Sequence, residues 1–237
     1  MQPIMYLFLF LSVIVSGLSV LFIDISSKNL KLILSFSGAF LFTISILHLI
    51  PEIYLSGTPD IGIYILAGFF IQILLEFFSE GIEHGHIHIH EHEHKHSAFP
   101  YAIMIGLSIH SFLEGMPLAN TNNESYNSLL VGIIMHNIPI AIALMTMLIK
   151  SNIKKTNAII WLVLFALITP LGTLTSYAID ANIIGNLSVY FDKIMAVVVG
   201  IFLHISTTIL FESSENHRFN LIKFLMILLG AGAAMMS

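Results

Sequence analysis

Apolar segments of about 20 residues follow one another along almost the whole chain, separated by short polar connections. A segment of this length crosses a bilayer as a helix, because lipid cannot satisfy backbone polar groups and barrel strands would be about half as long. Hydrophobic residues make up 57% of the chain and charged residues only 10%, unlike a soluble domain. We therefore predict an all-α polytopic membrane protein with eight transmembrane helices: Ile4–Ile23, Leu32–Ile50, Ile61–Ser79, Phe99–Ala119, Ser128–Ile149, Asn157–Ile179, Phe191–Phe211 and Phe219–Met236.

The basic residues indicate how these spans are oriented. Of the 9 lysines and arginines, all but Lys193 fall on one side of the predicted spans. Because connections rich in Lys and Arg face the cytoplasm, we expect both termini outside and a multi-pass protein of the cell (inner) membrane. The chain begins apolar with no positively charged leader, which predicts a first span and not a removed signal peptide. We expect one transmembrane domain over 1–237, with a cytoplasmic loop at 81–98 between the third and fourth spans.

The overall charge and the lack of cysteine narrow the chemistry. A net charge of -5 argues against nucleic-acid binding, so the expected partners are divalent metal ions and the lipid bilayer. There is no cysteine, which excludes disulfides, thiolate metal sites and dithiol redox chemistry. Metal ligands within the membrane would have to be histidine, carboxylate, amide, hydroxyl, methionine or backbone groups.

Two short motifs place polar side chains inside predicted spans. His110 and Glu114 stand four residues apart and face one side of the fourth span, while His136 and Asn137 lie in the middle of the fifth. An ionisable group in a bilayer costs about 2.5–3.5 kcal/mol on insertion scales, so it usually faces a partner or a cavity. Two imidazoles and a carboxylate on neighbouring helices predict an intramembrane metal site. The alternatives are a buried His–Glu pair that packs two helices together, and a hydrogen bond from His136 to another helix.

Prolines follow both motifs closely. Pro117 cannot donate a backbone hydrogen bond, so we expect the carbonyl of Leu113 to lose its helical partner, which frees an oxygen next to Glu114. Pro139 has the same expected effect on the carbonyl of Met135, beside His136.

The predicted cytoplasmic loop contains a low-complexity tract in which histidine occupies every second position and Glu91 and Glu93 are interleaved. Such a tract binds borderline divalent metals in many geometries but lacks the fixed spacing of a structural zinc site. We interpret it as a metal buffer or sensor, the alternative being a solvated linker. Its histidines are His84, His86, His88, His90, His92, His94 and His96.

Further polar residues stand near the ends of other spans. His48 and Glu52 are four apart near the predicted outer face, and form either an entry relay for ions or an interfacial cap. Glu76 and Glu80 stand near the predicted inner face, as an exit relay or as surface carboxylates. His204 is the lone histidine of the seventh span, where packing or hydrogen bonding between helices is the more frequent role; the alternative is a place in an entry or exit relay.

Taken in order, the motifs resemble those of the ZIP (Zrt/Irt-like) family of divalent-metal transporters over nearly the whole chain. The motif His110–Gly115 looks like the fourth-span metal motif of the family, and His136–Pro139 looks like the fifth-span motif. Further similar segments are Leu47–Glu52 in the second span, Gly68–Glu76 in the third, Thr169–Gly172 in the sixth and Gly200–Leu203 in the seventh. From the residues alone, Thr169–Gly172 suggests a kink or close helix packing.

This resemblance implies a 3+2+3 arrangement, with an inverted repeat around the fourth and fifth spans. It also implies import of divalent cations, most commonly zinc, with no cofactor besides the transported ion. Many members carry a metal-bridging glutamate after the fifth-span proline, but Ile140 stands there in this chain, and the sixth span offers no carboxylate. Ser111 and Asn137 occupy positions that hold a second metal in two-metal members. We therefore predict one ion on His110, Glu114 and His136, with Asn137 or water completing the shell.

Other functions remain open from the residues alone. A membrane-bound metalloenzyme such as a di-iron oxygenase needs more ligands per metal on the cytosolic side, so we predict that the protein is not an enzyme. A metal exporter, a nickel or cobalt permease, and a metal sensor that does not transport are further alternatives. The metal is open among Zn, Fe, Mn, Co and Cd, and so is the oligomeric state, a homodimer included.

Overall fold

The structure, a computed structural model, describes residues 3–79, 81–82, 100–119, 126–181, 183, 190–212 and 220–237. Within these ranges every regular element is helical, with no strand. A π-helical turn, η1 (Ser45–Leu49), links α2 to α3, and a 3₁₀ turn, η3 (Met116–Ala119), follows α5. The helices are α1 (Pro3–Ser19), α2 (Ser27–Ile44), α3 (Ile50–Leu55), α4 (Ile61–Ser79), α5 (Tyr101–Gly115), α6 (Tyr126–Lys150), α7 (Lys155–Ala166), α8 (Ile168–Asp180), α9 (Phe191–Glu212) and α10 (Leu221–Met235).

Among the described residues, five helical stretches are long and apolar enough to cross a membrane by length and composition. They are Ser27–Leu55, Ile61–Ser79, Asn127–Lys150, Lys155–Ile179 and Phe191–Phe211, and α1 and α10 are shorter apolar helices. Large apolar side chains on α4, among them Ile63, Phe70 and Phe77, are exposed, as expected for a surface that meets lipid tails. These features confirm a polytopic membrane protein built of helices.

Two predicted spans differ in detail from the observed helices. The second includes the turn η1 and continues beyond Ile50 through α3 to Leu55, so His48 lies within a longer helical stretch and not at its end. The sixth is two helices, α7 and α8, that meet at Leu167. Pro170 explains this break, because a proline in a helix clashes with the carbonyl four residues before it, here that of Ala166.

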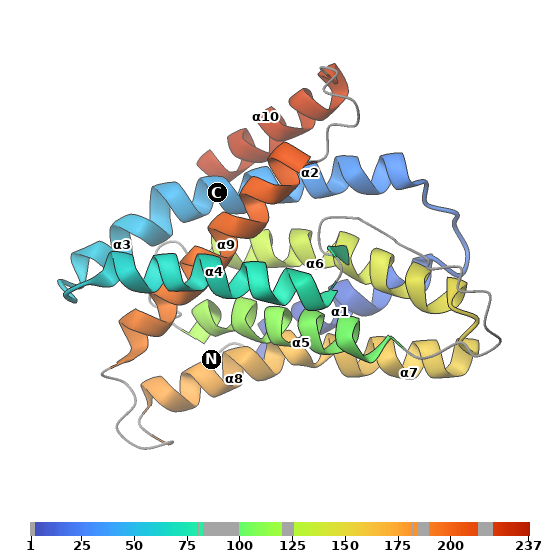
Figure 1. The fold of residues 1–237 in the computed structure, drawn as a ribbon, viewed down its shortest axis with the longest axis horizontal. Coiled ribbons are helices and arrows are strands. Elements are labelled where there is room, and N and C mark those ends of the chain that lie inside the picture. The colour runs from blue at the N-terminus through green and yellow to red at the C-terminus, as the bar shows by residue number, and fades with distance from the viewer. Residues whose placement is uncertain are drawn as a thin grey trace.

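The helices pack mainly in pairs (Figure 1). The pair α2 and α10 lie side by side, and α9 crosses α4 obliquely, while α1 packs on α6 and α5 packs on α8. The helix α6 is central, because 67% of the residues in its most apolar stretch are buried. The buried apolar residues of the described chain form two clusters, and α6 contributes to both: Ile140 and Leu144 to one, Leu129 and Ile133 to the other. A polar side chain on the buried face of α6 is therefore surrounded by protein and not by lipid.

Three helix crossings depend on glycine: that of α10 on α2, where Gly230 lies against the carbonyl of Phe36, and the two that follow. A Cβ on Gly68 of α4 would overlap the backbone carbonyl of Val197 on α9, and one on Gly200 would overlap that of Ile65 on α4. At the third crossing, Gly115 at the end of α5 lies against the backbone of Thr169 on α8. Gly172 of α8 lies equally close to the carbonyl of Phe112 on α5. The expected close packing of Thr169–Gly172 is thus observed, and it fixes the position of α5 next to its metal-ligand candidates.

Candidate metal centre

Three of the predicted ligands lie together between α5 and α6. The Nε2 atoms of His110 and His136 each lie 3.5 Å from Oε1 of Glu114. Ligand atoms of all three residues lie within 4.8 Å of one another, and the three side chains are at most 1% exposed. The spacing of His110 and Glu114 places both on one helix face, and the packing of α6 brings His136 to that face.

The distances within this cluster suit a shared metal ion better than a direct hydrogen bond. A hydrogen bond between imidazole and carboxylate is about 2.7–2.9 Å long when charged. Two ligand atoms of one tetrahedral zinc, with bonds of about 2.0–2.1 Å, lie about 3.3–3.4 Å apart. The separations of 3.5 Å from Glu114 to His110 and to His136 are close to the second value. The two separations from Glu114 are therefore those expected of ligands that share one divalent cation.

Asn137 and Ser111 are the neighbours of two of these ligands and are themselves 0% exposed. Neither the amide of Asn137 nor the hydroxyl of Ser111 has a hydrogen-bond partner within the part of the chain that the structure describes. A buried polar group without a partner costs about 1–3 kcal/mol, which a bound ion or water would recover. The burial of the Asn137 amide without a partner is consistent with the expectation that Asn137 provides the fourth ligand.

An apolar residue stands beside the cluster on α6. Ile140 stands one turn after His136 on α6, is 0% exposed, and belongs to an apolar cluster that includes Leu107 and Ile201. Low polarity strengthens the attraction between a divalent cation and the carboxylate of Glu114. The position that would carry a bridging glutamate therefore contributes packing and no charge.

One expectation about the backbone is wrong. The carbonyl of Leu113 accepts the N–H of Met116, so it is not freed by Pro117 as a ligand oxygen. The physical reason is that the chain tightens into the 3₁₀ turn η3 after Gly115. In such a turn the N–H group three residues later, that of Met116, donates to the carbonyl, so the missing N–H group of Pro117 is not needed. Pro139 lies inside the continuous helix α6.

Thr173 of α8 is a residue that the sequence interpretation missed. Its buried hydroxyl donates a 2.7 Å hydrogen bond to the carbonyl of Gly115, directly after Glu114. This bond holds the end of α5 against α8 and so fixes the backbone that carries Glu114. A threonine one turn after Thr169, beside Gly172, was the available signal for a residue at a close helix contact.

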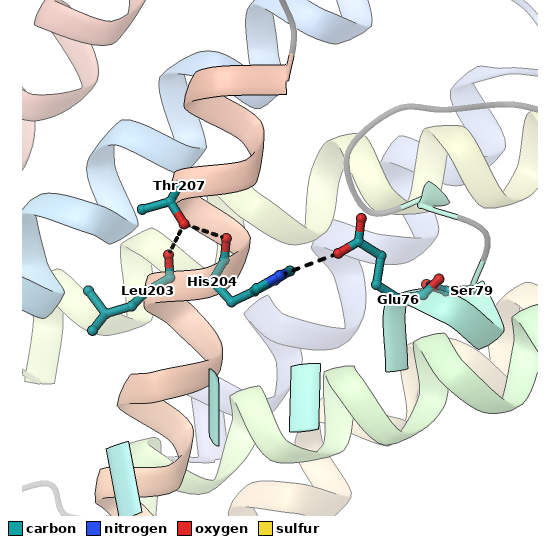
Figure 2. A network of polar contacts seen from close by, with 5 residues as sticks. All are labelled: Glu76, Ser79, Leu203, His204 and Thr207. Carbon is teal, nitrogen blue, oxygen red and sulfur yellow. Dashed lines mark hydrogen bonds and ion pairs between the residues drawn. The ribbon is translucent and has the colours of Figure 1, made fainter. Parts of the chain in front are cut away.

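The remaining candidates lie apart from the cluster or outside the described residues. His48 is partly buried in the π-helical turn η1, and Glu52 lies on α3. His204 of α9 and Glu76 of α4 meet across the two helices, with Nε2 and Oε2 3.6 Å apart (Figure 2). Because the two side chains meet, His204 does more than pack between helices, and Glu76 is not simply a surface carboxylate. Glu80 and the histidines of the loop, at 84–96, lie outside the residues that the structure describes.

The helical bundle and the buried His–Glu–His cluster define a multi-pass membrane protein with a candidate intramembrane metal site. Residues 80–237 match the model of the family described as ZIP Zinc transporter. Because the match covers more than half of the chain, the protein belongs to the ZIP zinc transporter family. No curated protein sequence matches the chain significantly. Members of this family are metal transporters and not enzymes, so membership implies transport of divalent metal ions.

Proposed function

We propose that this protein imports divalent cations, zinc foremost, into the cytoplasm through one metal site on α5 and α6. The observation that carries the proposal is the convergence of His110, Glu114 and His136 at ligand spacing in a buried part of the bundle. Two imidazoles and one carboxylate suit zinc, iron, cobalt or manganese and disfavour calcium and magnesium, which prefer all-oxygen shells. Asn137 or water would complete the shell.

The proposed path enters beside His48 and Glu52 and ends at the histidines of the cytoplasmic loop. His48 supports this path because its Nδ1 atom is buried without a hydrogen-bond partner among the described residues. The turn that carries it is π-helical, and such turns often occur at functional sites. The pairing of helices also supports an inverted repeat: α1 on α6 mirrors α8 on α5, and α2 on α10 mirrors α9 on α4. Sites of transporters built in this way lie between the repeats.

The direct test is uptake of radioactive zinc into proteoliposomes. We expect the wild-type protein to accumulate zinc and His110→Ala to abolish uptake, since the site loses one of its three ligands. The matched control is Ile109→Ala, which truncates the neighbouring residue of the same helix on an outward face. Binding of zinc without any flux in the wild type would favour a sensor. Equal uptake by the wild type and His110→Ala would mean that the intramembrane cluster is structural.

Uptake should fall as the external pH is lowered from about 7 to about 5, because a protonated imidazole cannot coordinate a metal. The contribution of the two histidines is present while they are neutral and is lost as protons compete for their nitrogens. The measurement is the initial rate of zinc uptake at one fixed concentration of free zinc across this range. Uptake that vanishes at neutral pH and persists near pH 5 would contradict histidine coordination.

Asn137→Leu should weaken zinc binding about tenfold, or about 1.4 kcal/mol, and should leave transport in place. Leucine keeps the branched shape of the side chain and removes its polar atoms, while water replaces the amide as the fourth ligand. Zinc affinity is measured by competition with a chelator, and Met135→Leu, two residues away on an exposed face of α6, is the control. An unchanged affinity would assign the fourth position to water or to another group.

A further inference from the structure

A cavity of about 390 Å³ lies where the connection from α1 to α2 passes the end of α6 (Figure 1). Sites for small molecules commonly have volumes of about 300–1,000 Å³, so this space can hold a ligand. Its wall is formed by residues 20–25 of the connection, by the start of α2 and by one face of α6 from Ile142 to Lys150. Ile142 follows His136 by six residues, which places it about 120° around α6 from the metal cluster. The cavity is therefore separate from the candidate metal centre.

The wall of this cavity changes from polar to apolar along its length. Lys150 ends α6 and is exposed, whereas Ile142, about 12 Å earlier along the same helix, is buried. On the other side, Asp24 and Ser27 are exposed, and Leu30, one turn into α2, is buried. The headgroup layer of a bilayer is only about 5–8 Å thick on each side, so the apolar end lies at the depth of the lipid tails. A ligand that fills this cavity therefore has one polar end and one apolar end.

Apolar side chains at the polar end show that the cavity is reached from the bilayer. Phe22 is 85% exposed and Ile23 is 59% exposed, and both belong to the cavity wall. Large apolar and aromatic side chains at the end of a membrane helix lie at the level of the lipid headgroups. A molecule that already resides in the membrane can enter here without crossing water, which favours a lipid over a soluble metabolite.

The charges at the polar end indicate which lipid headgroup fits. Asp24 and Lys150 both line the cavity, and within the described chain neither forms an ion pair. One carboxylate and one ammonium group are complementary to a headgroup that carries both an amine and a phosphate. A primary amine donates hydrogen bonds to a carboxylate, and a quaternary amine has no N–H group to donate. The hydroxyls of Ser27 and Thr146 also line the cavity and supply further donors for a phosphate.

We propose that this cavity binds one molecule of phosphatidylethanolamine from the leaflet on the predicted cytoplasmic side. Lys150 binds the phosphate, Asp24 binds the primary ammonium group, and an acyl chain lies along Ile142 and Leu30. Basic pockets between membrane helices on the cytoplasmic side commonly bind lipid headgroups, and the carboxylate of Asp24 adds a preference for the amine. The bound lipid contacts both the α1–α2 connection and α6, the helix that carries His136. The inference holds whether or not the protein transports zinc.

The test is native mass spectrometry of the full chain, titrated in detergent with phosphatidylethanolamine or with phosphatidylcholine of the same short acyl chains. We expect one phosphatidylethanolamine per chain, bound about tenfold more tightly than phosphatidylcholine. Asp24→Asn should remove this preference and leave the binding of phosphatidylcholine unchanged. Lys150→Gln should weaken both lipids about fivefold, because both carry a phosphate. The matched controls are Asp60→Asn and Lys154→Gln, which each remove one exposed charge outside the cavity and should change neither affinity.

Three results would overturn the proposal. Equal affinities of the wild type for the two lipids, or a preference that survives Asp24→Asn, would show that the carboxylate does not bind the amine. Tighter binding of phosphatidylglycerol, which has no amine, would mean that lysines of this face attract anionic lipids in general. Binding of free phosphoethanolamine as tight as that of the lipid would assign the cavity to a soluble ligand. Thermal unfolding of each variant without added lipid, with a midpoint equal to that of the wild type, shows that lost binding does not come from misfolding.

Discussion

Glu114→Gln is expected to lower the affinity for zinc at the main site by about 100-fold or more, or about 2.7 kcal/mol. Glu114 supplies the only negative charge in a cluster whose other ligands are two imidazoles, and all three side chains are buried away from water. In such surroundings a divalent cation held by neutral groups alone lacks the charge that compensates for its lost hydration. Glutamine keeps the shape of the side chain, so the change removes charge and leaves the packing intact.

The measurement is a zinc titration against a competing chelator, with the loop histidines replaced by serine. Asp192→Asn is the matched control, because it removes one carboxylate charge from α9, where Asp192 accepts a hydrogen bond from Thr58. We expect this control to leave the affinity unchanged. An affinity that is equally high in Glu114→Gln and the wild type would show that zinc binds elsewhere.

Gly68→Ala is expected to destabilise the protein by about 3 kcal/mol. The added methyl group would overlap the backbone carbonyl of Val197 and lie 2.7 Å from its carbonyl carbon and 2.9 Å from its Cα. These are backbone atoms, so the clash cannot be relieved by turning a side chain, and α9 would have to move away from α4. A loss of this size corresponds to a fall of roughly 6–12 °C in the midpoint of thermal unfolding for a chain of this length.

Thermal unfolding in detergent measures this effect, with Gly232→Ala as the control. Gly232 lies in α10, and a Cβ there meets nothing within 4 Å. Alanine has the higher helix propensity, so the control should keep or slightly raise the midpoint. Equal midpoints for the two variants would mean that the contact between α4 and α9 yields easily and does not determine their crossing.

The apolar segments were sufficient to predict most of the helices. The third predicted span, Ile61–Ser79, coincides with α4, because a long apolar segment between turns has no other stable state in lipid. The kink suggested by Thr169–Gly172 is observed as the break at Leu167, whereas the π-helical turn before Pro51 was not predicted. Hydropathy records how apolar a segment is but not the hydrogen-bond register of its backbone, and prolines change that register locally.

The candidate site was predictable to the extent that it is local. The spacing of His110 and Glu114 places both on one helix face, and the polar residues of the next span pointed to His136. The contact between Glu76 and His204 was not predictable, because it depends on how α9 crosses α4, and backbone contacts at Gly68 and Gly200 set that crossing. The error at Leu113 has a similar cause, since the 3₁₀ turn after Gly115 supplied a donor that a regular α-helix would not.

The central claim is that His110, Glu114 and His136 hold one transported ion together. The most direct test is the X-ray absorption spectrum of zinc bound to the protein with its loop histidines replaced by serine. The account predicts nitrogen and oxygen ligands at about 2.0–2.2 Å, with the scattering of two imidazoles. One imidazole should disappear in His136→Ala. A spectrum without imidazole scattering, or one unchanged by His136→Ala, would contradict the account.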